Sequence, residues 1–444
     1  MMLRQIHGCS WRIGVASGAA IVAATIVVAA MTTAIASQRD GRGQWVGVLD
    51  EHPAIAWATR PTTDRIAALN TRVGSGDLTL SWEPGSGYLR SVLDALDVPV
   101  ASQMLVLSRT GVQRTVTSPD NPRALFYNEQ TAVGFIRRSP FLELITQDPM
   151  QGPVFYTLDQ RLTERPTFTR QTSCVTCHVA TATLEVPGLL TRSLAATSDG
   201  TLRLRLGSET AIDHRTPFER RWGGWFVTGR HGTLTHRGNI VYGADDQPRS
   251  LVTGGPLNVR ALHGAVDLGG YPATQSDVVA LAVFDHQTRA LNLLTRLGWE
   301  VRVAAHEGRP PLATPVVTAL LADLVDYLLF VGEAPMTGGL DGQSGFTAWF
   351  SERGPRDQRG RTLHALDLET RLMRYPLSYT IDSPVFDALP DDIRGAVYRG
   401  LAAVLSGGER SSKYAHLTPH DRRAVIEILR DTKPEARAVI PASR

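Results

Sequence analysis

The stretch SDVVALAVFDHQTRALNLLTRL, residues 276–297, indicates the fold more clearly than any other part of the chain. Positions 279, 283, 286, 290, 293 and 297 follow one another at intervals of four and three, so they share one face of a helix. Five of them are Val, Ala or Leu, and the sixth is His286. Ser276 or Asp277 can cap the amino end. The stretch therefore predicts a helix with one histidine in its apolar stripe.

Apolar spacing predicts further helices towards the carboxyl end, in 315–330, 361–374, 384–405 and 419–430. The last begins with Thr418-Pro419, a capping residue followed by proline at the first helical position. Residues 248–444 are therefore expected to form a mainly helical region.

Before residue 248 the pattern mixes short helices and strands. Helices are expected in 63–71 and 88–96, and strands in 103–107, 132–136 and 154–158. A hairpin is expected in 194–206, with Leu202, Leu204 and Leu206 on a dry face, and a second hairpin or pair of loops in 222–242. The expected class is α+β, with a mixed region over 37–165 and a region with hairpins over 166–247.

The first 36 residues resemble an export signal. Arg4 and Arg12 precede an uncharged apolar run, and Ala34-Ile35-Ala36 has the form of a signal-peptidase site. The run also approaches the roughly 20 residues that span a bilayer. Residues 1–36 are expected to be a signal peptide or a membrane anchor. Either way the remaining chain is expected in the periplasm or cell envelope, attached to the membrane if the segment is not cleaved.

Composition excludes several classes of protein. The chain has 444 residues, 43% of them apolar, which is typical of a globular protein. Its 46 basic and 43 acidic residues give a net charge of +3, too balanced to indicate binding to nucleic acid. Three cysteines, Cys9, Cys174 and Cys177, exclude a disulfide scaffold.

The segment with recognisable chemistry is Thr172-Ser173-Cys174-Val175-Thr176-Cys177-His178. Two thiols three residues apart can bond to the two vinyl groups of one porphyrin, and the adjacent imidazole can bind the iron, so CxxCH is the attachment signature of haem c. The motif predicts one covalent haem on Cys174 and Cys177, with His178 as proximal ligand. The export signal agrees, because haem c is attached outside the cytoplasm.

Three other interpretations of the motif remain open. A redox-active dithiol is one, although thioredoxin-like sites lie in a βαβ unit that is absent from the pattern here. Structural zinc would have to recruit distant histidines, because no second cysteine pair exists. A disulfide across the motif would leave His178 unexplained.

Several strings resemble one family. CVTCH resembles c-type cytochromes, and the string RWGGWFVTGRHG at 221–232 is similar to one in large exported bacterial proteins that contain a cytochrome c domain. The strings DHR at 213–215 and VALAVFDHQ at 279–287 are similar to the same group, a family of unestablished substrate. The resemblance implies a large exported monohaem c-type cytochrome that transfers electrons.

The sixth iron ligand separates an electron carrier from a catalyst. His236 and His231 are the preferred distal candidates, because they lie on a glycine-rich segment that could fold over the haem; Met150 and Met373 are less favoured. His286 is a candidate for the haem pocket, with a core histidine bonded to a nearby carbonyl as the alternative. Asp213 and His214 are expected on a surface turn.

Two functions follow from these predictions. The first is an exported monohaem cytochrome that passes electrons between redox partner proteins of the envelope. The alternative is a haem-dependent, peroxidase-like oxidoreductase with an open distal iron site, in which His231 or His236 acts as acid or base. A third interpretation, a haem-based sensor, requires a signalling partner. Trp222, Trp225 and Phe226 could wall the porphyrin, and Arg220 and Arg221 could bind its propionates.

Overall fold

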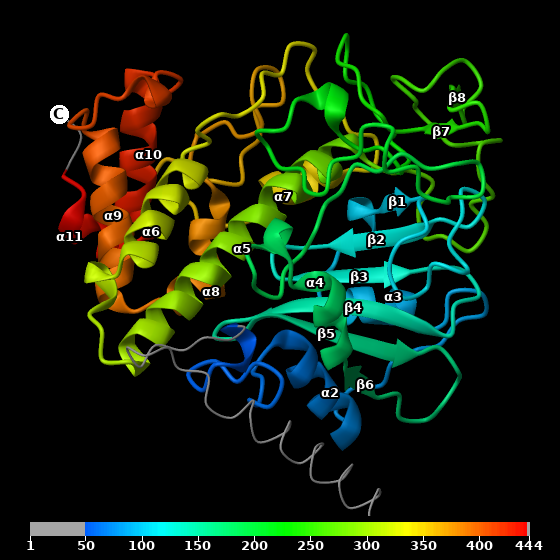
Figure 1. The fold of residues 1–444 in the computed structure, drawn as a ribbon, viewed down its shortest axis with the longest axis horizontal. Coiled ribbons are helices and arrows are strands. Elements are labelled where there is room, and N and C mark those ends of the chain that lie inside the picture. Colours follow the sequence, from blue (N-terminus) through cyan, green and yellow to red (C-terminus); the bar gives the residue numbers. More distant parts are fainter. Residues whose placement is uncertain (1–48, 442–444) are drawn as a thin grey trace, which may run out of the picture. The chain divides into compact units, whose positions relative to one another are not determined.

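A computed structural model describes residues 49–441. The expected signal or anchor in residues 1–36 lies outside this range. Among the described residues no helix is long and apolar enough to cross a membrane. The fold combines one large antiparallel sheet with a helical half, which confirms the α+β class (Figure 1).

The large sheet contains six strands in sequence order, each antiparallel to the next. The strands are β1 Met104–Val106, β2 Arg123–Tyr127, β3 Thr131–Phe135, β4 Phe141–Asp148, β5 Gly152–Asp159 and β6 Phe168–Arg170. The turn after β4 is closed by Asp148, whose Oδ1 accepts hydrogen bonds from the amides of Met150 and Gln151 at 2.9 and 2.8 Å. A second sheet is a hairpin of β7 Ile240–Tyr242 and β8 Pro248–Ser250.

Helices pack on both faces of the large sheet. On one face lie α2 Arg65–Ser75 and α3 Leu89–Ala95, which share a core with Leu105, Phe126 and Val133. On the other lies α5 Val278–His306, which shares a core with Met104, Val106 and Tyr127. Neighbouring residues of β1 thus enter different cores, as the two-residue period of a strand requires.

Helix α5 is the central element of the fold. Of its 29 residues, 23 are buried, because it lies between the sheet and helices that follow it in the chain (Figure 1). Gly152 permits the close approach to the sheet, since a Cβ there would lie 2.4 Å from Cγ2 of Thr295. The remaining helices are α4 Val175–His178, α6 Pro315–Leu328, α7 Phe346–Ser351, α8 Pro384–Asp387, α9 Asp391–Leu405, α10 Pro419–Thr432 and α11 Pro434–Val439. The helix predicted from the 276–297 pattern is confirmed and extends further.

Two predicted helices are wrong in part or in full. Residues 361–374 form turns with one bridge between Leu366 and Met373. The Asp367 carboxylate accepts hydrogen bonds from the amides of Glu369 and Thr370, and such local bonds compete with a helix. The helix predicted over 384–405 divides into α8 and α9, because Pro390 has no amide hydrogen for a continuous helix.

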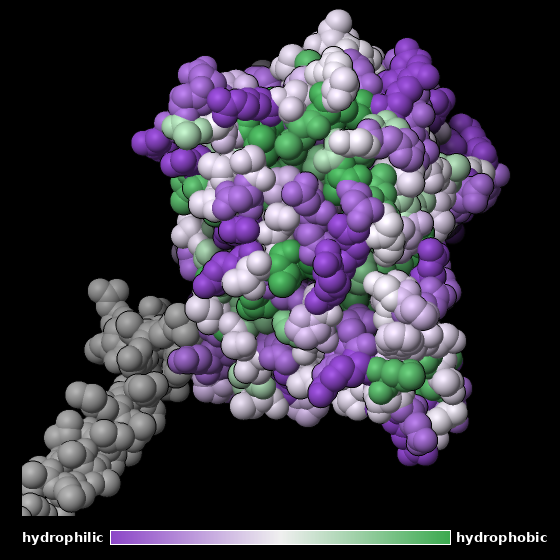
Figure 2. Space-filling view, turned by 90° about the vertical axis from the view of Figure 1, so that its right-hand side faces the viewer, coloured by the Kyte–Doolittle hydropathy of each residue, from purple (hydrophilic) through white to green (hydrophobic). Residues whose placement is uncertain are grey.

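The expected hairpin in 194–206 is reduced to a tight turn with a single bridge between Ala196 and Leu202. Leu204 is 61% exposed, so the prediction of a dry leucine face is wrong. Residues 222–242 are mostly loop, the second of the two arrangements expected there. Figure 2 shows the face of the molecule near β7 and β8 as a mixture of hydrophilic and hydrophobic side chains.

Candidate haem-attachment site

The two motif cysteines lie on neighbouring helical turns directly after β6. A 3-10 turn, Thr172–Cys174, leads into the single α-helical turn of α4. Residues three apart on such turns face the same side. Cys174 is half-buried, Cys177 is exposed, and both are free thiols. The backbone thus presents two thiols on one side, as a porphyrin with two vinyl groups requires.

His178 is held by the loop that follows it. Its Nδ1 lies 2.8 Å from the carbonyl oxygen of Gly188, and the amide of Gly188 donates to the His178 carbonyl at 2.9 Å. Desolvation lowers the pKa of His178, which favours the neutral imidazole. With Nδ1–H donating to a carbonyl, Nε2 carries the lone pair, and no described residue bonds to it. Metal-ligating histidines use this arrangement.

A cleft of about 140 Å³ opens beside Cys177 and His178. Its apolar lining comprises Val106, Leu125, Leu190, Leu194 and Trp225. Arg192 also lines it, and the Nε of Arg192 is buried without a hydrogen-bond partner. Apolar walls and an unpaired guanidinium suit one edge of a porphyrin with a propionate. Cys177 and His178 line this cleft and Cys174 does not, so the residues present fit one edge of a haem c and the rest of the ring would extend beyond the cleft.

The structure bears on two of the other interpretations of the motif. Burial raises the pKa of the Cys174 thiol, with smaller contributions from Glu143 and Cys177. A reactive dithiol has a lowered thiol pKa, so this environment disfavours one. A structural zinc ion needs four ligands. Among residues 49–441, no three His, Cys, Asp or Glu side chains converge to hold a metal ion.

His231 and His236, the residues predicted as distal iron ligands, do not line this cleft. His231 and His236 are 1% and 6% exposed and contact each other, with ring centroids 4.7 Å apart. Burial lowers the pKa of His236 to about 3. Met150 lines another cavity, with Leu294 and Trp299. The residues that line the cleft include no methionine and no histidine except His178.

His286 is a buried core histidine, as the alternative prediction had it, but its ring nitrogens bond to side chains and not to a carbonyl. Its Nδ1 lies 2.8 Å from Nδ1 of His214, and its Nε2 lies 2.6 Å from Oγ of Ser378. Its ring stacks on Phe330 and Tyr327. No residue of the cleft is among these contacts. The expected surface position of His214 is wrong, because the side chain is 1% exposed and forms half of this buried pair.

Three sequence strings were noted above for their resemblance to one family, at 213–215, 221–232 and 279–287. They come together in the structure. The indole of Trp222 donates to Asp285 Oδ2 at 3.0 Å, and Arg221 donates to the His214 carbonyl at 2.8 Å. Burial raises the pKa of Asp285 to about 7, against the opposing charge of Arg221. Trp225 lines the cleft beside Cys177 and His178, but Trp222 does not. Arg221 is buried in this cluster, and Arg220 pairs with Glu209 at 2.7 Å, so neither guanidinium is free for a propionate.

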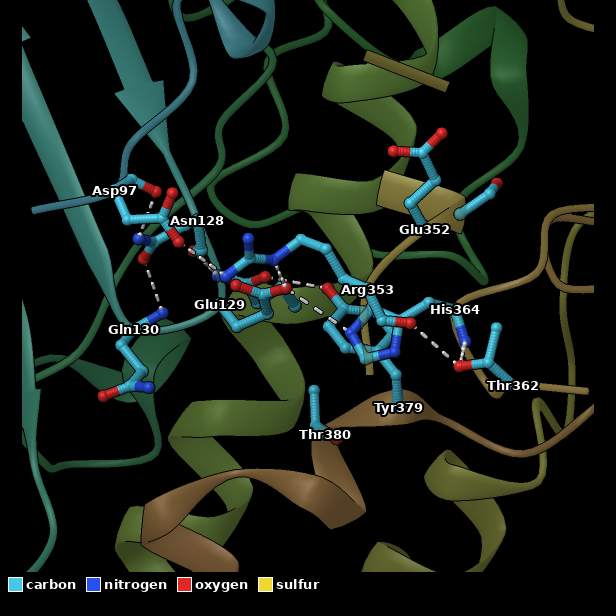
Figure 3. A network of polar contacts seen from close by, with 12 residues as sticks. Asp97, Asn128, Glu129, Gln130, Glu352, Arg353, Thr362, His364, Tyr379 and Thr380 are labelled. Carbon is cyan, nitrogen blue, oxygen red and sulfur yellow. Dashed lines mark hydrogen bonds and ion pairs between the residues drawn. The ribbon is translucent and has the colours of Figure 1, made fainter. Parts of the chain in front are cut away.

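A larger cavity, of about 410 Å³, lies elsewhere and was not predicted from the sequence. Figure 3 shows its polar network, in which Arg353 bridges Glu129 at 2.7 Å and Asp97 at 3.0 Å. His364 Nε2 lies 3.5 Å from Glu129 Oε1. These residues come from distant parts of the chain, so no local motif could reveal them.

Comparison of the chain with protein-family models, with curated proteins and with solved structures finds no match.

Proposed function

We propose that the chain is an exported monohaem c-type cytochrome of the periplasm or cell envelope. Cys174 and Cys177 would hold one haem through thioether bonds, and His178 Nε2 would bind its iron. The observation that carries the proposal is the hydrogen bond from His178 Nδ1 to Gly188, next to two thiols on one side of a helical turn. Bound haem supplies one-electron redox chemistry.

Electron transfer to partner proteins is the activity that we favour. Cys177 is exposed and the cleft opens to the surface, so a partner could approach the attachment site closely. Arg192 offers an unpaired guanidinium for a propionate. Loop 178–188, tied by the Gly188 contacts, would keep the proximal imidazole in place during redox cycling.

A haem-dependent oxidoreductase is the second candidate, favoured by one observation. The cleft residues supply neither Met nor a second His opposite His178. Ser108, Thr110 and Arg192 are polar groups in the lining that could orient a small molecule. His231 and His236, proposed from the sequence as acid or base, do not line this cleft.

The test is a visible spectrum of the full chain produced with haem-maturation machinery, together with a pyridine haemochrome. We expect one covalent haem per chain, and its absence would overturn the proposal. Carbon monoxide and cyanide then separate the two candidates. A low-spin spectrum that neither ligand changes indicates a closed electron carrier, whereas a high-spin spectrum that both change indicates an open iron. Peroxide turnover by the open form would support the oxidoreductase.

A further inference from the structure

A separate polar cavity of about 220 Å³ shares one lining residue with the cleft beside Cys177 and His178. The two cavities share only Leu190 among their lining residues. Thr191 lines the polar cavity and Arg192 lines the cleft, so successive residues line different cavities. The cavity therefore has its own chemistry, independent of the proposed haem.

Arg289 of α5 is the unusual group in this cavity. Its Nε is buried without a hydrogen-bond partner, and no described residue forms an ion pair with it. Burial lowers the pKa of Arg289, and the nearby Arg215 adds to this effect. Removing a cation from water without a partner is costly. A bound anion would offset that cost.

The other charges of the cavity limit the charge of such an anion. Asp213 is engaged with Arg215, whose Nε lies 3.2 and 3.1 Å from the two carboxylate oxygens. Asp213 and Asp323 act on Arg289 through their charge without a hydrogen bond to it, and Asp323 does not line the cavity. The paired charges cancel, so Arg289 leaves one net positive charge. One net positive charge balances a monoanion, whereas a dianion would leave one negative charge uncompensated.

We propose that this cavity binds one small free monocarboxylate, held by the Arg289 guanidinium. The planar guanidinium matches a carboxylate in a two-point hydrogen-bonded contact. The hydroxyls of Thr191 and Thr288 line the same space, 3.4 Å from each other. The volume equals that of roughly seven liquid waters, enough for an acid of two to four carbons.

The test is calorimetric titration of the full-length matured protein with sodium acetate, at constant ionic strength and pH 7. We expect one acetate per chain and a raised Tm, because a ligand that binds only the folded state stabilises it. Sodium phosphate and sodium succinate, as dianions, should bind at least tenfold more weakly. Absence of acetate binding would overturn the proposal. Occupation of the cavity by a haem propionate, which would also prevent acetate binding, would overturn it too.

Arg289→Gln should weaken acetate binding at least tenfold, and binding that survives this change would contradict the proposal. Without acetate its Tm should not fall, since the variant removes an unpaired, partly buried cation; a purely structural arginine would lower it. Arg399→Gln, at an exposed position of α9, is the matched control and should bind acetate normally. If Arg289→Gln fails to fold, Arg289→Lys keeps the charge, loses the planar contact and should still weaken binding.

Discussion

His178 is fixed through both its ring and its backbone. Nδ1 donates to the Gly188 carbonyl, while the His178 carbonyl accepts from Gly188 and from Thr183 Oγ1 at 3.1 Å. The tautomer that this geometry favours leaves Nε2 as the basic nitrogen. The motif, the loop and the lowered pKa of His178 all support the role proposed for it, a neutral imidazole that binds iron through Nε2.

Replacing both motif cysteines tests the proposed covalent attachment of haem. Cys174→Ala with Cys177→Ala should abolish covalent haem, because no thiol of the described chain remains to form a thioether. Haem staining after denaturing electrophoresis measures the loss. Cys9→Ala is the matched control and should keep the stain. Covalent haem that persists in the double variant would contradict the assignment.

We expect the contribution of Glu129 to the free energy of unfolding to decrease in acid. Burial alone would raise the pKa of Glu129, but the nearby His364 imidazole and the hydrogen-bonded Arg353 guanidinium outweigh it and lower the pKa from 4.5 to about 2. A carboxylate with a lowered folded-state pKa stabilises the protein above its unfolded pKa, and this stability is lost as pH falls from about 4.5 to about 2.

We expect Glu129→Gln to lower the free energy of unfolding at pH 7 by about 3 kcal/mol, and the difference from wild type to shrink towards pH 2. Urea unfolding at several pH values measures it. Glu352→Gln, an exposed carboxylate at the same cavity, should change stability by no more than about 0.5 kcal/mol. A pH-independent difference would contradict the prediction.

Asp277, the residue before helix α5, fixes the start of the helix in the fold. The Asp277 carboxylate accepts from the amides of Val279 and Ala280 at 2.9 and 3.0 Å, capping the helix. It also accepts from the amides of Gln343 and Ser344 at 2.9 and 3.0 Å. One buried side chain therefore caps the central helix and ties a distant loop to it.

Removal of this cap should cost more than removal of an ordinary one. Asp277→Ala should lower the free energy of unfolding by roughly 3 kcal/mol, because four amides lose their acceptor and two of them, those of Val279 and Ala280, are buried. Thr418→Ala removes a cap at α10, where Thr418 Oγ1 accepts from one amide at 3.1 Å, and should cost about 1 kcal/mol. Denaturant unfolding of both variants measures the contrast, and equal losses would refute it.

The described residues form one compact unit, and its cores do not follow the sequence regions. The core around α5 contains Met104 and Tyr127 of the sheet together with Leu401 and Val425 of the carboxyl-terminal helices. The regions 37–165, 166–247 and 248–444 therefore mark changes of secondary structure along one continuous packing arrangement.

Truncation of the chain after residue 247 tests whether the sheet region folds without the helical half. Residues 49–247 should lack a cooperative unfolding transition, because α5 is absent and one face of the sheet is then uncovered. Far-UV circular dichroism during urea titration measures this, with the full chain as control. A cooperative transition in the fragment would show that the sheet region is a domain.

Local patterns predicted much of the fold correctly. The α+β class, the helices α2, α3, α5, α6 and α10 and three strands of the sheet follow from short-range spacing and caps. β2, β4 and β6 were missed. In β4 buried Leu142 and Leu144 alternate with less buried neighbours, but of those only Glu143 is polar, so the alternation is weak in the sequence. β6 has only three residues, too few for a period.

The sequence by itself determined the CxxCH motif on which the proposed haem attachment rests, because the spacing of these residues is a local property of the chain. Only the tertiary structure decided which side chains surround it. It separated His231, His236 and His286 from the cleft, paired His214 with His286, and left Arg289 unpaired in its cavity. The physical reason is that such contacts join residues far apart in the chain, and packing of the sheet against α5 sets them.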